Sequence, residues 1–203
     1  MRKIIFIHGM SSTITAVFGK GVKNSLDKLQ IKNYEPVFEL HPNISFQKWT
    51  NEMDKYRELI DSDTVFVCHS LGTNFIIRYL ADNKIKCKGI ISVAGGVVKS
   101  KSEVPSELAY LYEFAPNDQE FAFCKQNVPY KYNIFNKDDH IWSLEQMHRY
   151  TKKLGAKAIE LPYGKHFGRS SGITDLPIVT QIIKQDIFPN RLEDKNAAFN
   201  NLQ

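Results

Sequence analysis

Residues 64–77 decide the fold of this chain and read TVFVCHSLGTNFII. The first part is a β-branched and aromatic run, which is typical of a buried strand. The run stops at Ser70, and an apolar-periodic segment typical of a helix follows without a gap. A serine at such a sharp corner holds its hydroxyl above the sheet, beside the free N–H groups and positive dipole end of the helix. This placement favours a nucleophile, and the alternative is that Ser70 is only the helix N-cap.

Strands and helices alternate on both sides of this stretch. Apolar or β-branched runs predict strands over residues 3–7, 34–40, 64–68, 88–93, 130–135 and 156–161. Helical spacing predicts helices over residues 17–30, 46–60 (capped by Ser45), 71–80 and 144–153, and a last one capped by Thr174 or Asp175. Such alternation predicts an α/β fold, a three-layer α/β/α sandwich with a mainly parallel sheet of about six strands.

One domain is the natural count for 203 residues, and we assign it to residues 1–187. The alternation breaks in residues 97–127, which we interpret as a cap-like insertion. Its aromatic residues, Phe114 and Phe121 among them, either form a satellite core or line an acyl pocket, and we expect the pocket. The polar, Asn-rich segment 188–203 is expected to be a flexible tail.

Composition excludes several classes of protein. The formal charge is +5, but the basic residues are scattered without an aromatic-basic motif, so no nucleic-acid partner is expected. Three widely spaced cysteines argue against a disulfide framework and favour a reducing compartment. No secretory signal and no membrane-spanning run is found, so we expect a cytoplasmic protein. The sequence leaves a monomer and a homodimer equally open.

Polar loops follow several predicted strands, and ligands bind at that edge of a parallel sheet. The candidate catalytic residues among these loops are Ser70, Asp139 and His166, in that order along the chain. Serine needs a base to accept its proton, His166 can do this near neutral pH, and Asp139 would orient the imidazole. The Leu71 N–H, directly after Ser70, and the Met10 N–H, in the loop after the first strand, are the predicted oxyanion donors.

The other histidines receive structural interpretations. His8 and His69 flank the predicted site, and we interpret them as shaping its loops. His41, His140 and His148 form no metal-ligand motif, and nothing resembles HExxH or paired CxxC. We therefore expect neither a metal nor a cofactor.

Four motifs together resemble the α/β-hydrolase superfamily. They read IFIHGM at residues 5–10, CHSLG at 68–72, KDDHI at 137–141 and GKHFG at 164–168. The size is similar to the small serine-hydrolase branch of the retinoblastoma-binding-protein-nine type, over about residues 3–187. The resemblance implies a sheet centred on the strands at residues 3 and 64, and hydrolysis of esters, thioesters or amides without a cofactor.

Two positions depart from the family pattern. The first glycine of Gly-x-Ser-x-Gly is Cys68 here, a small residue that belongs on the strand and that we do not interpret as the nucleophile. The family's acid usually precedes a short hydrophobic stretch, which favours Asp139 and leaves Asp138 as the alternative.

The predicted function is hydrolysis of a small-molecule carboxylic ester or thioester through an acyl-enzyme on Ser70. A peptidase or amidase with the same triad is an alternative. So is a non-catalytic interaction protein on a hydrolase fold, with the aromatic insertion as its contact surface.

Overall fold

A computed structural model describes residues 1–189, and its centre is one sheet of six parallel strands. The strands are β1 (Lys3–Ile7), β2 (Lys32–Tyr34), β3 (Thr64–His69), β4 (Gly89–Val93), β5 (Tyr130–Phe135) and β6 (Lys157–Glu160). Their spatial order is β2-β1-β3-β4-β5-β6, so β1, β3, β4 and β5 are interior strands. Every residue of β1, β3 and β4 is buried, because helices cover both faces of the sheet.

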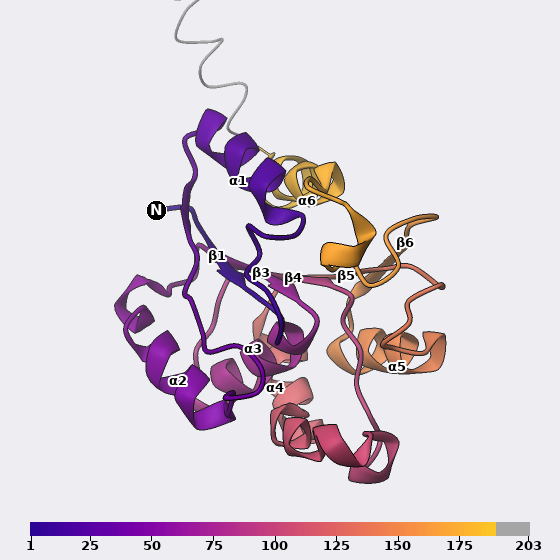
Figure 1. The fold of residues 1–203 in the computed structure, drawn as a ribbon. Coiled ribbons are helices and arrows are strands. Elements are labelled where there is room, and N and C mark those ends of the chain that lie inside the picture. The colour runs from indigo at the N-terminus through magenta and orange to yellow at the C-terminus, as the bar shows by residue number, and fades with distance from the viewer. Residues whose placement is uncertain (190–203) are drawn as a thin grey trace, which may run out of the picture.

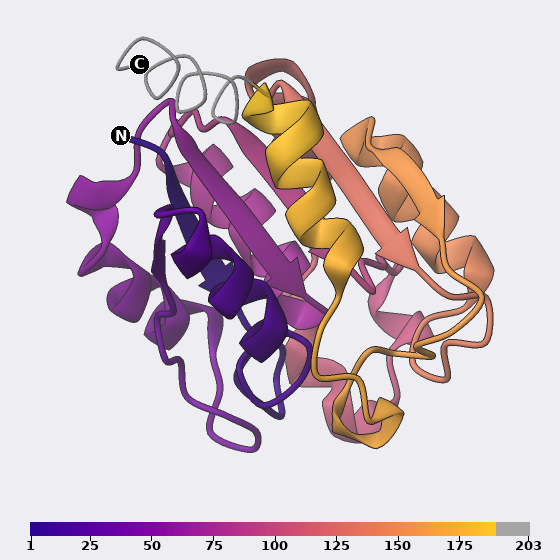
Figure 2. The ribbon, with the colours of Figure 1, turned by 90° about the horizontal axis from the view of Figure 1, so that it is seen from above.

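The helices form two layers (Figure 1). On one face lie α1 (Gly19–Lys28) and α6 (Pro177–Ile182), which Figure 2 shows side by side in front of the strands. On the other face lie α2 (Phe46–Asp54), α3 (Leu71–Asp82), α4 (Asp118–Asn127) and α5 (Leu144–Leu154). Short 3-10 turns cover Arg57–Leu59 (η1), Lys101–Glu103 (η2), Ser106–Phe114 (η3) and Arg169–Ser171 (η4), and a π-turn covers Ile183–Ile187 (η5). The predicted three-layer α/β/α class is confirmed.

Strand β1 shows how the period of two divides the apolar residues between two cores. Ile4 and Phe6 join the core under α1 and α6. Ile5 and Ile7 join the core under α2, α3 and α4. Side chains alternate across a strand, so a near-continuous apolar run can fill both layers.

The predicted strand over residues 34–40 is wrong beyond Tyr34, where β2 ends. Pro36 has no N–H to donate, and Val37 and Leu40 are exposed. The Phe38 N–H donates to Nε2 of His8, in the loop after β1, at 3.0 Å. At that point the backbone therefore binds a side chain and does not pair with a neighbouring strand.

Helix boundaries differ from the prediction in two places. Ser45 caps α2 as expected, since its Oγ accepts from the Lys48 N–H at 3.2 Å, but the helix ends at Asp54 and η1 follows. The cap of α6 is Leu176, whose N–H donates to the Asp175 carboxylate, and neither Thr174 nor Asp175 is itself the cap.

Residues 97–127 contain two different structures. Turns η2 and η3 cross the C-terminal edge of the sheet, and α4 then packs as a regular helix against α3 and α5. Helix α4 begins with a capping box made by Asn117 and Glu120. The Phe114 ring lies 5.1 Å from Trp49, and the Phe121 ring lies 5.7 Å from Tyr150, measured between centroids. Both phenylalanines therefore belong to the core, and the expectation that they line a pocket is wrong. Among the aromatic residues of this segment, Tyr112 does line one.

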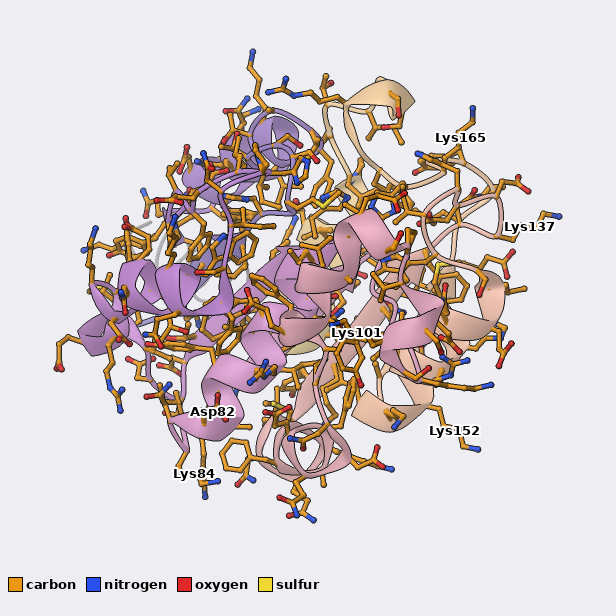
Figure 3. All side chains as sticks on the ribbon, turned by 60° about the horizontal axis from the view of Figure 1, so that its bottom comes forward. Asp82, Lys84, Lys101, Lys137, Lys152 and Lys165 are labelled. Atoms are coloured by element: carbon orange, nitrogen blue, oxygen red, sulfur yellow. The ribbon has the colours of Figure 1, made fainter. Side chains whose placement is uncertain are left out.

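The surface carries its charges at separate points. In Figure 3 the labelled lysines lie apart from one another on several elements: Lys84, Lys101, Lys137, Lys152 and Lys165. None of the helices within residues 1–189 is long and apolar enough to cross a membrane. The predicted tail lies outside the described residues, except for Phe188 and Pro189.

Candidate active site

A sharp corner between β3 and α3 positions Ser70. Strand β3 ends at His69, helix α3 begins at Leu71, and Ser70 between them has φ 51° and ψ −121°. A positive φ is uncommon for a residue with a side chain, and such strain occurs where surrounding structure fixes it. Here the Ser70 N–H donates to the Val93 carbonyl oxygen at 3.0 Å. The corner is thus held at the C-terminal edge of the sheet.

Close packing of α3 on β1 explains the glycine two residues after Ser70. A Cβ at Gly72 would lie 2.4 Å from the His8 carbonyl oxygen and 2.7 Å from that of Ile7. Two residues before Ser70, by contrast, Cys68 lies wholly buried in β3. Burial raises the pKa of its thiol well above the usual value, so Cys68 is a core residue, as its strand position predicts.

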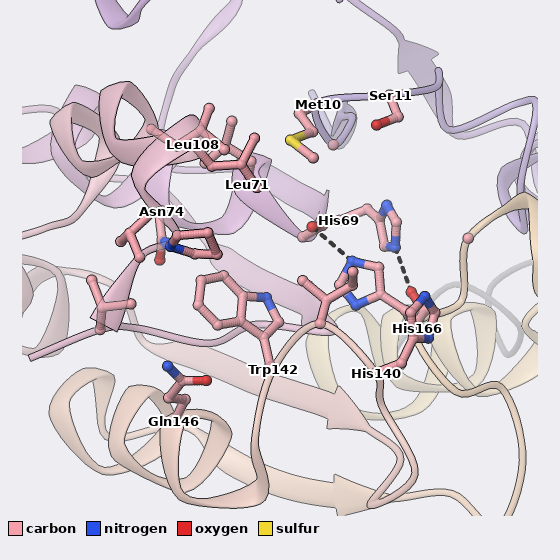
Figure 4. Close-up of a pocket in the computed structure, with 18 of the residues that line it drawn as sticks. Met10, Ser11, His69, Leu71, Asn74, Leu108, His140, Trp142, Gln146 and His166 are labelled. Carbon is pink, nitrogen blue, oxygen red and sulfur yellow. Dashed lines mark hydrogen bonds between the residues drawn. The ribbon is translucent and has the colours of Figure 1, made fainter. Parts of the chain in front are cut away.

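The structure brings Ser70, His166 and Asp139 together from three loops at the same edge of the sheet. His166 Nε2 lies 2.8 Å from Ser70 Oγ (Figure 4). His166 Nδ1 lies 2.8 Å from Asp139 Oδ2 and 3.0 Å from Oδ1. The predicted base His166 therefore lies within hydrogen-bond reach of both the predicted nucleophile and the predicted orienting carboxylate.

Asp139, and not Asp138, contacts the imidazole. Its side chain is fully buried, and its Oδ1 accepts from the backbone N–H groups of Ile141 at 2.7 Å and Trp142 at 3.0 Å. Asp138 is exposed, and its N–H donates to Asn136 Oδ1 at 3.0 Å. The two backbone donors hold the Asp139 side chain in one orientation.

His8 fixes one of the two predicted oxyanion donors. Because its Nε2 accepts from Phe38, its Nδ1 carries the proton and donates to the Gly9 carbonyl oxygen at 2.6 Å. The Gly9 carbonyl and the Met10 N–H belong to one planar peptide and point in opposite directions. His8 thus sets the direction of the Met10 N–H, and the His41 N–H, which donates to the Met10 carbonyl at 2.9 Å, holds the following peptide. Leu71 presents its N–H from the first turn of α3.

His69 holds the loop that carries His166. Its Nε2 lies 2.8 Å from the His166 carbonyl oxygen, which can only accept, so Nε2 carries the proton. Burial, and then the neighbouring His166, lower the pKa of His69 to about 3. The ring is therefore neutral at physiological pH, and both histidines that flank Ser70 in the loops bind backbone groups, as interpreted from the sequence.

A pocket of about 600 Å³ opens beside Ser70. Its walls are largely apolar and come from the site loops, from η3 and from the loop after β5; they include Met10, Leu71, Val104, Leu108, Leu111 and Trp142. Sequence reasoning missed its polar residue Asn74. The available signal was a lone amide one turn beyond Ser70 in an otherwise apolar helix. No signal marked Trp142 as a pocket residue. Within residues 1–189, no three His, Cys, Asp or Glu side chains gather in a group that could hold a metal ion.

The sequence and the fold of this chain are similar to those of known proteins. YdeN of Bacillus subtilis (strain 168) is 25% identical over 185 residues, which are 90% of this chain and 94% of that protein. The crystal structure of the ydeN gene product superposes with a TM-score of 0.77 and 23% identity, covering 90% of this chain and 97% of the other.

Two solved structures with lower identity share the fold. Est1E from Butyrivibrio proteoclasticus, solved with ferulic acid bound, has a TM-score of 0.62 and 15% identity over 91% of this chain and 87% of the other. A thioesterase domain from the curacin biosynthetic pathway has a TM-score of 0.58 and 14% identity over 90% and 91%. The model of one family, described as Serine hydrolase, matches residues 24–185. Because that match spans most of the chain, including Ser70, Asp139 and the edge of the sheet that they share, the chain belongs to the serine hydrolase family, on the α/β-hydrolase fold.

Proposed function

We propose that this protein cleaves carboxylic esters or thioesters through an acyl-enzyme on Ser70, with His166 as the base and Asp139 as its orienting acid. The observation that carries the proposal is the pair of 2.8 Å distances that link Ser70 Oγ to His166 Nε2 and His166 Nδ1 to Asp139 Oδ2. A non-catalytic protein has no need to align these three groups around a strained serine.

The reaction follows from these contacts. Ser70 Oγ attacks the substrate carbonyl carbon while His166 Nε2 accepts its proton. The Met10 and Leu71 N–H groups donate to the oxyanion that forms. The intermediate collapses, the His166 proton passes to the leaving group, and the C–O or C–S bond breaks. Water, activated by His166, then attacks the acyl-Ser70 carbonyl and releases the acid and the free serine.

The pocket supports a small acyl substrate. A cavity of about 600 Å³ with apolar walls lies within the range of small-molecule sites and suits an acyl chain. The shared fold also supports the reaction class, since a thioesterase domain is built on it. One fold hosts many substrates, so the choice between ester, thioester and amide rests on the assay.

The test compares p-nitrophenyl butyrate, the matching butyryl thioester and the matching butyryl anilide. Wild-type protein is expected to turn over the ester and the thioester faster than the anilide. Ser70→Ala and His166→Ala should each lower turnover by about 10⁴-fold or more, and the double variant little further, because triad members act as a unit. Ser62→Ala, an exposed serine away from the site, is the matched control.

Two outcomes would change the proposal. Ester turnover by Ser70→Ala equal to that of wild type would remove the nucleophile. A faster reaction with the anilide than with the ester would make the protein an amidase with the same triad.

A further inference from the structure

Two polar side chains that line the pocket have no hydrogen-bond partner among residues 1–189. Asn74 is only 3% exposed, and its carbonyl oxygen is shielded from solvent and unpaired. The indole Nε1 of Trp142 is likewise shielded and unpaired. More than nine in ten buried polar groups in proteins are paired, so the unpaired groups of this pocket, these two and Nδ1 of His69, need an explanation.

The two groups come from different walls and are held in place. Asn74 lies one turn beyond Ser70 on α3, about 5.4 Å along the helix axis, and helical side chains lean back toward the N-terminus, here toward Ser70. The Trp142 backbone N–H binds Asp139, and a Cβ on Gly96 would lie 2.4 Å from the indole ring, so the ring rests on the glycine backbone. Figure 4 shows Asn74 and Trp142 on the same side of His166, with the nitrogen-bearing edge of the indole turned toward it.

Neither group is paired within the described part of the chain, and the walls of the pocket are largely apolar, although Glu103 and Gln146 also line it. Leu71, Leu108 and Leu111 complete this part of the pocket. An indole N–H only donates, whereas an asparagine amide donates and accepts, and rotation about its last torsion brings either atom toward the cavity. A plain alkyl chain would leave both groups desolvated and unpaired, at a cost in binding. A chain with a group that both accepts and donates would pair them.

We propose that the acyl pocket selects chains that carry a hydroxyl or an amide near the third or fourth atom from the scissile carbonyl, with Asn74 and Trp142 as the residues that recognise this group. The position follows from the one-turn separation of Asn74 from Ser70. This inference rests on the proposed function, because it assigns the substrate class of the same site.

The experiment measures kcat/KM for pairs of esters that are matched in chain length. Ethyl 3-hydroxyhexanoate against ethyl hexanoate tests the hydroxyl, and ethyl N-acetylglycinate against ethyl pentanoate tests the amide. The esters of a pair differ in intrinsic reactivity. We therefore divide kcat/KM for the polar ester by kcat/KM for its alkyl match, and we compare this polar-to-alkyl ratio between wild type and each variant. Asn74→Leu, which keeps the shape of the side chain, should lower the ratio of at least one pair about fivefold or more, through the hydrogen bond it loses.

Trp142→Phe keeps an aromatic ring and removes only the donor, so it should lower the same polar-to-alkyl ratio about fivefold. If Asn74→Leu fails to fold, Trp142→Phe still tests the inference. Asn83→Leu is the matched control, because Asn83 lies at the other end of α3, where it binds Arg57 and the Tyr79 carbonyl. It should leave both ratios unchanged.

A binding measurement separates this inference from the proposed function. Titration calorimetry of Ser70→Ala with the same esters measures their affinities without turnover. Ser70→Ala should bind the polar ester of a pair more tightly than its alkyl match, and the double variant Ser70→Ala/Asn74→Leu should lose this difference. Ratios that stay unchanged in Asn74→Leu and Trp142→Phe, or rates that fall equally for polar and alkyl esters, would overturn the inference. Selective binding by Ser70→Ala without any turnover by wild type would overturn the proposed function alone.

Discussion

The His8 ring shows how one side chain can set the direction of a backbone N–H that it does not itself contact, here the proposed oxyanion donor of Met10. It accepts from Phe38 at one nitrogen and donates to Gly9 at the other, so its tautomer and orientation are both fixed. The consequence falls on the Met10 N–H, which shares the Gly9 peptide plane. Losing an oxyanion donor typically costs about 10²–10³ in turnover.

His8→Phe should therefore lower kcat for ester hydrolysis by about 10- to 100-fold and change KM little, because the Gly9–Met10 peptide is then free to turn. His148→Phe, the same substitution at an exposed histidine outside the pocket, is the matched control and should leave kcat unchanged. Steady-state kinetics on variants that keep a cooperative melting transition provide the measurement. An unchanged kcat in His8→Phe would show that other contacts hold the oxyanion loop.

The acidic doublet gives a second prediction for single residues. Asp139→Asn should reduce kcat by up to about 10⁴-fold, because an amide favours the wrong tautomer of His166. Asp138→Asn, a change of the same kind at the exposed neighbour, should leave kcat within a few-fold of wild type. The reverse ranking in steady-state assays would move the orienting role to Asp138.

At this scale the sequence predicted which three side chains meet at the edge of the sheet better than it predicted the residues around them. Ser70, Asp139 and His166 follow strands whose ends must meet, so their order along the chain was informative. The contacts of His8 with Phe38 and the position of Trp142 depend on loops whose path no periodicity encodes. Asn74 carried a usable signal, an amide in an apolar helix, and only the structure shows that it lines the pocket.

Among the elements, residues 97–127 divide between a roof over the pocket and a helix of the outer layer. Leu108 and Leu111 of η3 line the pocket, whereas Phe114 at the end of η3 is fully buried against α2 and α3. Aromatic content alone cannot separate these roles, because both surfaces are apolar. The predicted strand over residues 34–40 fails beyond Tyr34 for a similar reason. Its apolar residues fit the pattern of a strand, but the Phe38 N–H donates to the His8 side chain and not to a neighbouring strand.

A pair of truncations separates roof from core. Phe114→Ala should lower the free energy of unfolding by about 3–5 kcal/mol and leave the preferred acyl length unchanged. Leu108→Ala should cost less stability and shift the preference toward longer acyl chains, because it enlarges the pocket. Urea denaturation and a chain-length series of p-nitrophenyl esters measure both effects. A changed length profile in Phe114→Ala would return that residue to the pocket wall.

For the whole molecule, the buried neutral histidines predict how stability depends on pH. The pKa of His69 falls to about 3 in the folded protein, and burial also lowers that of His8, from a usual value of 6.5. Between these pH values the unfolded chain binds protons that the folded chain does not. The stabilisation from His69 is therefore complete above about pH 6.5 and is lost as the pH falls toward 3, by at most ~1.4 kcal/mol per pH unit, and His8 contributes in the same direction.

His69→Gln should flatten this dependence. Urea denaturation at several values between about pH 7.5 and pH 4.5 gives the free energy of unfolding, and its slope against pH should be smaller in His69→Gln than in wild type. The exposed His148→Gln should keep the wild-type slope. Equal slopes in all three proteins would mean that other groups cause the acid sensitivity.

The overall architecture was the most predictable level. The apolar runs of the strands and the helical spacing between them alternate along the chain, as a parallel sheet covered by helices requires. The order of the strands in the sheet and the division of the helices between its faces come from the structure. They place Ser70 at the centre, where β3 pairs with β1 and β4.

The central claim is that Ser70 is the nucleophile, and labelling by a fluorophosphonate probe tests it most directly. Intact-mass and peptide-mass spectrometry should find one adduct per wild-type chain, on the peptide that contains Ser70, and none on Ser70→Ala. His166→Ala should react far more slowly, since its serine lacks a base. Equal labelling of wild type and Ser70→Ala, or an adduct at another residue, would contradict the account.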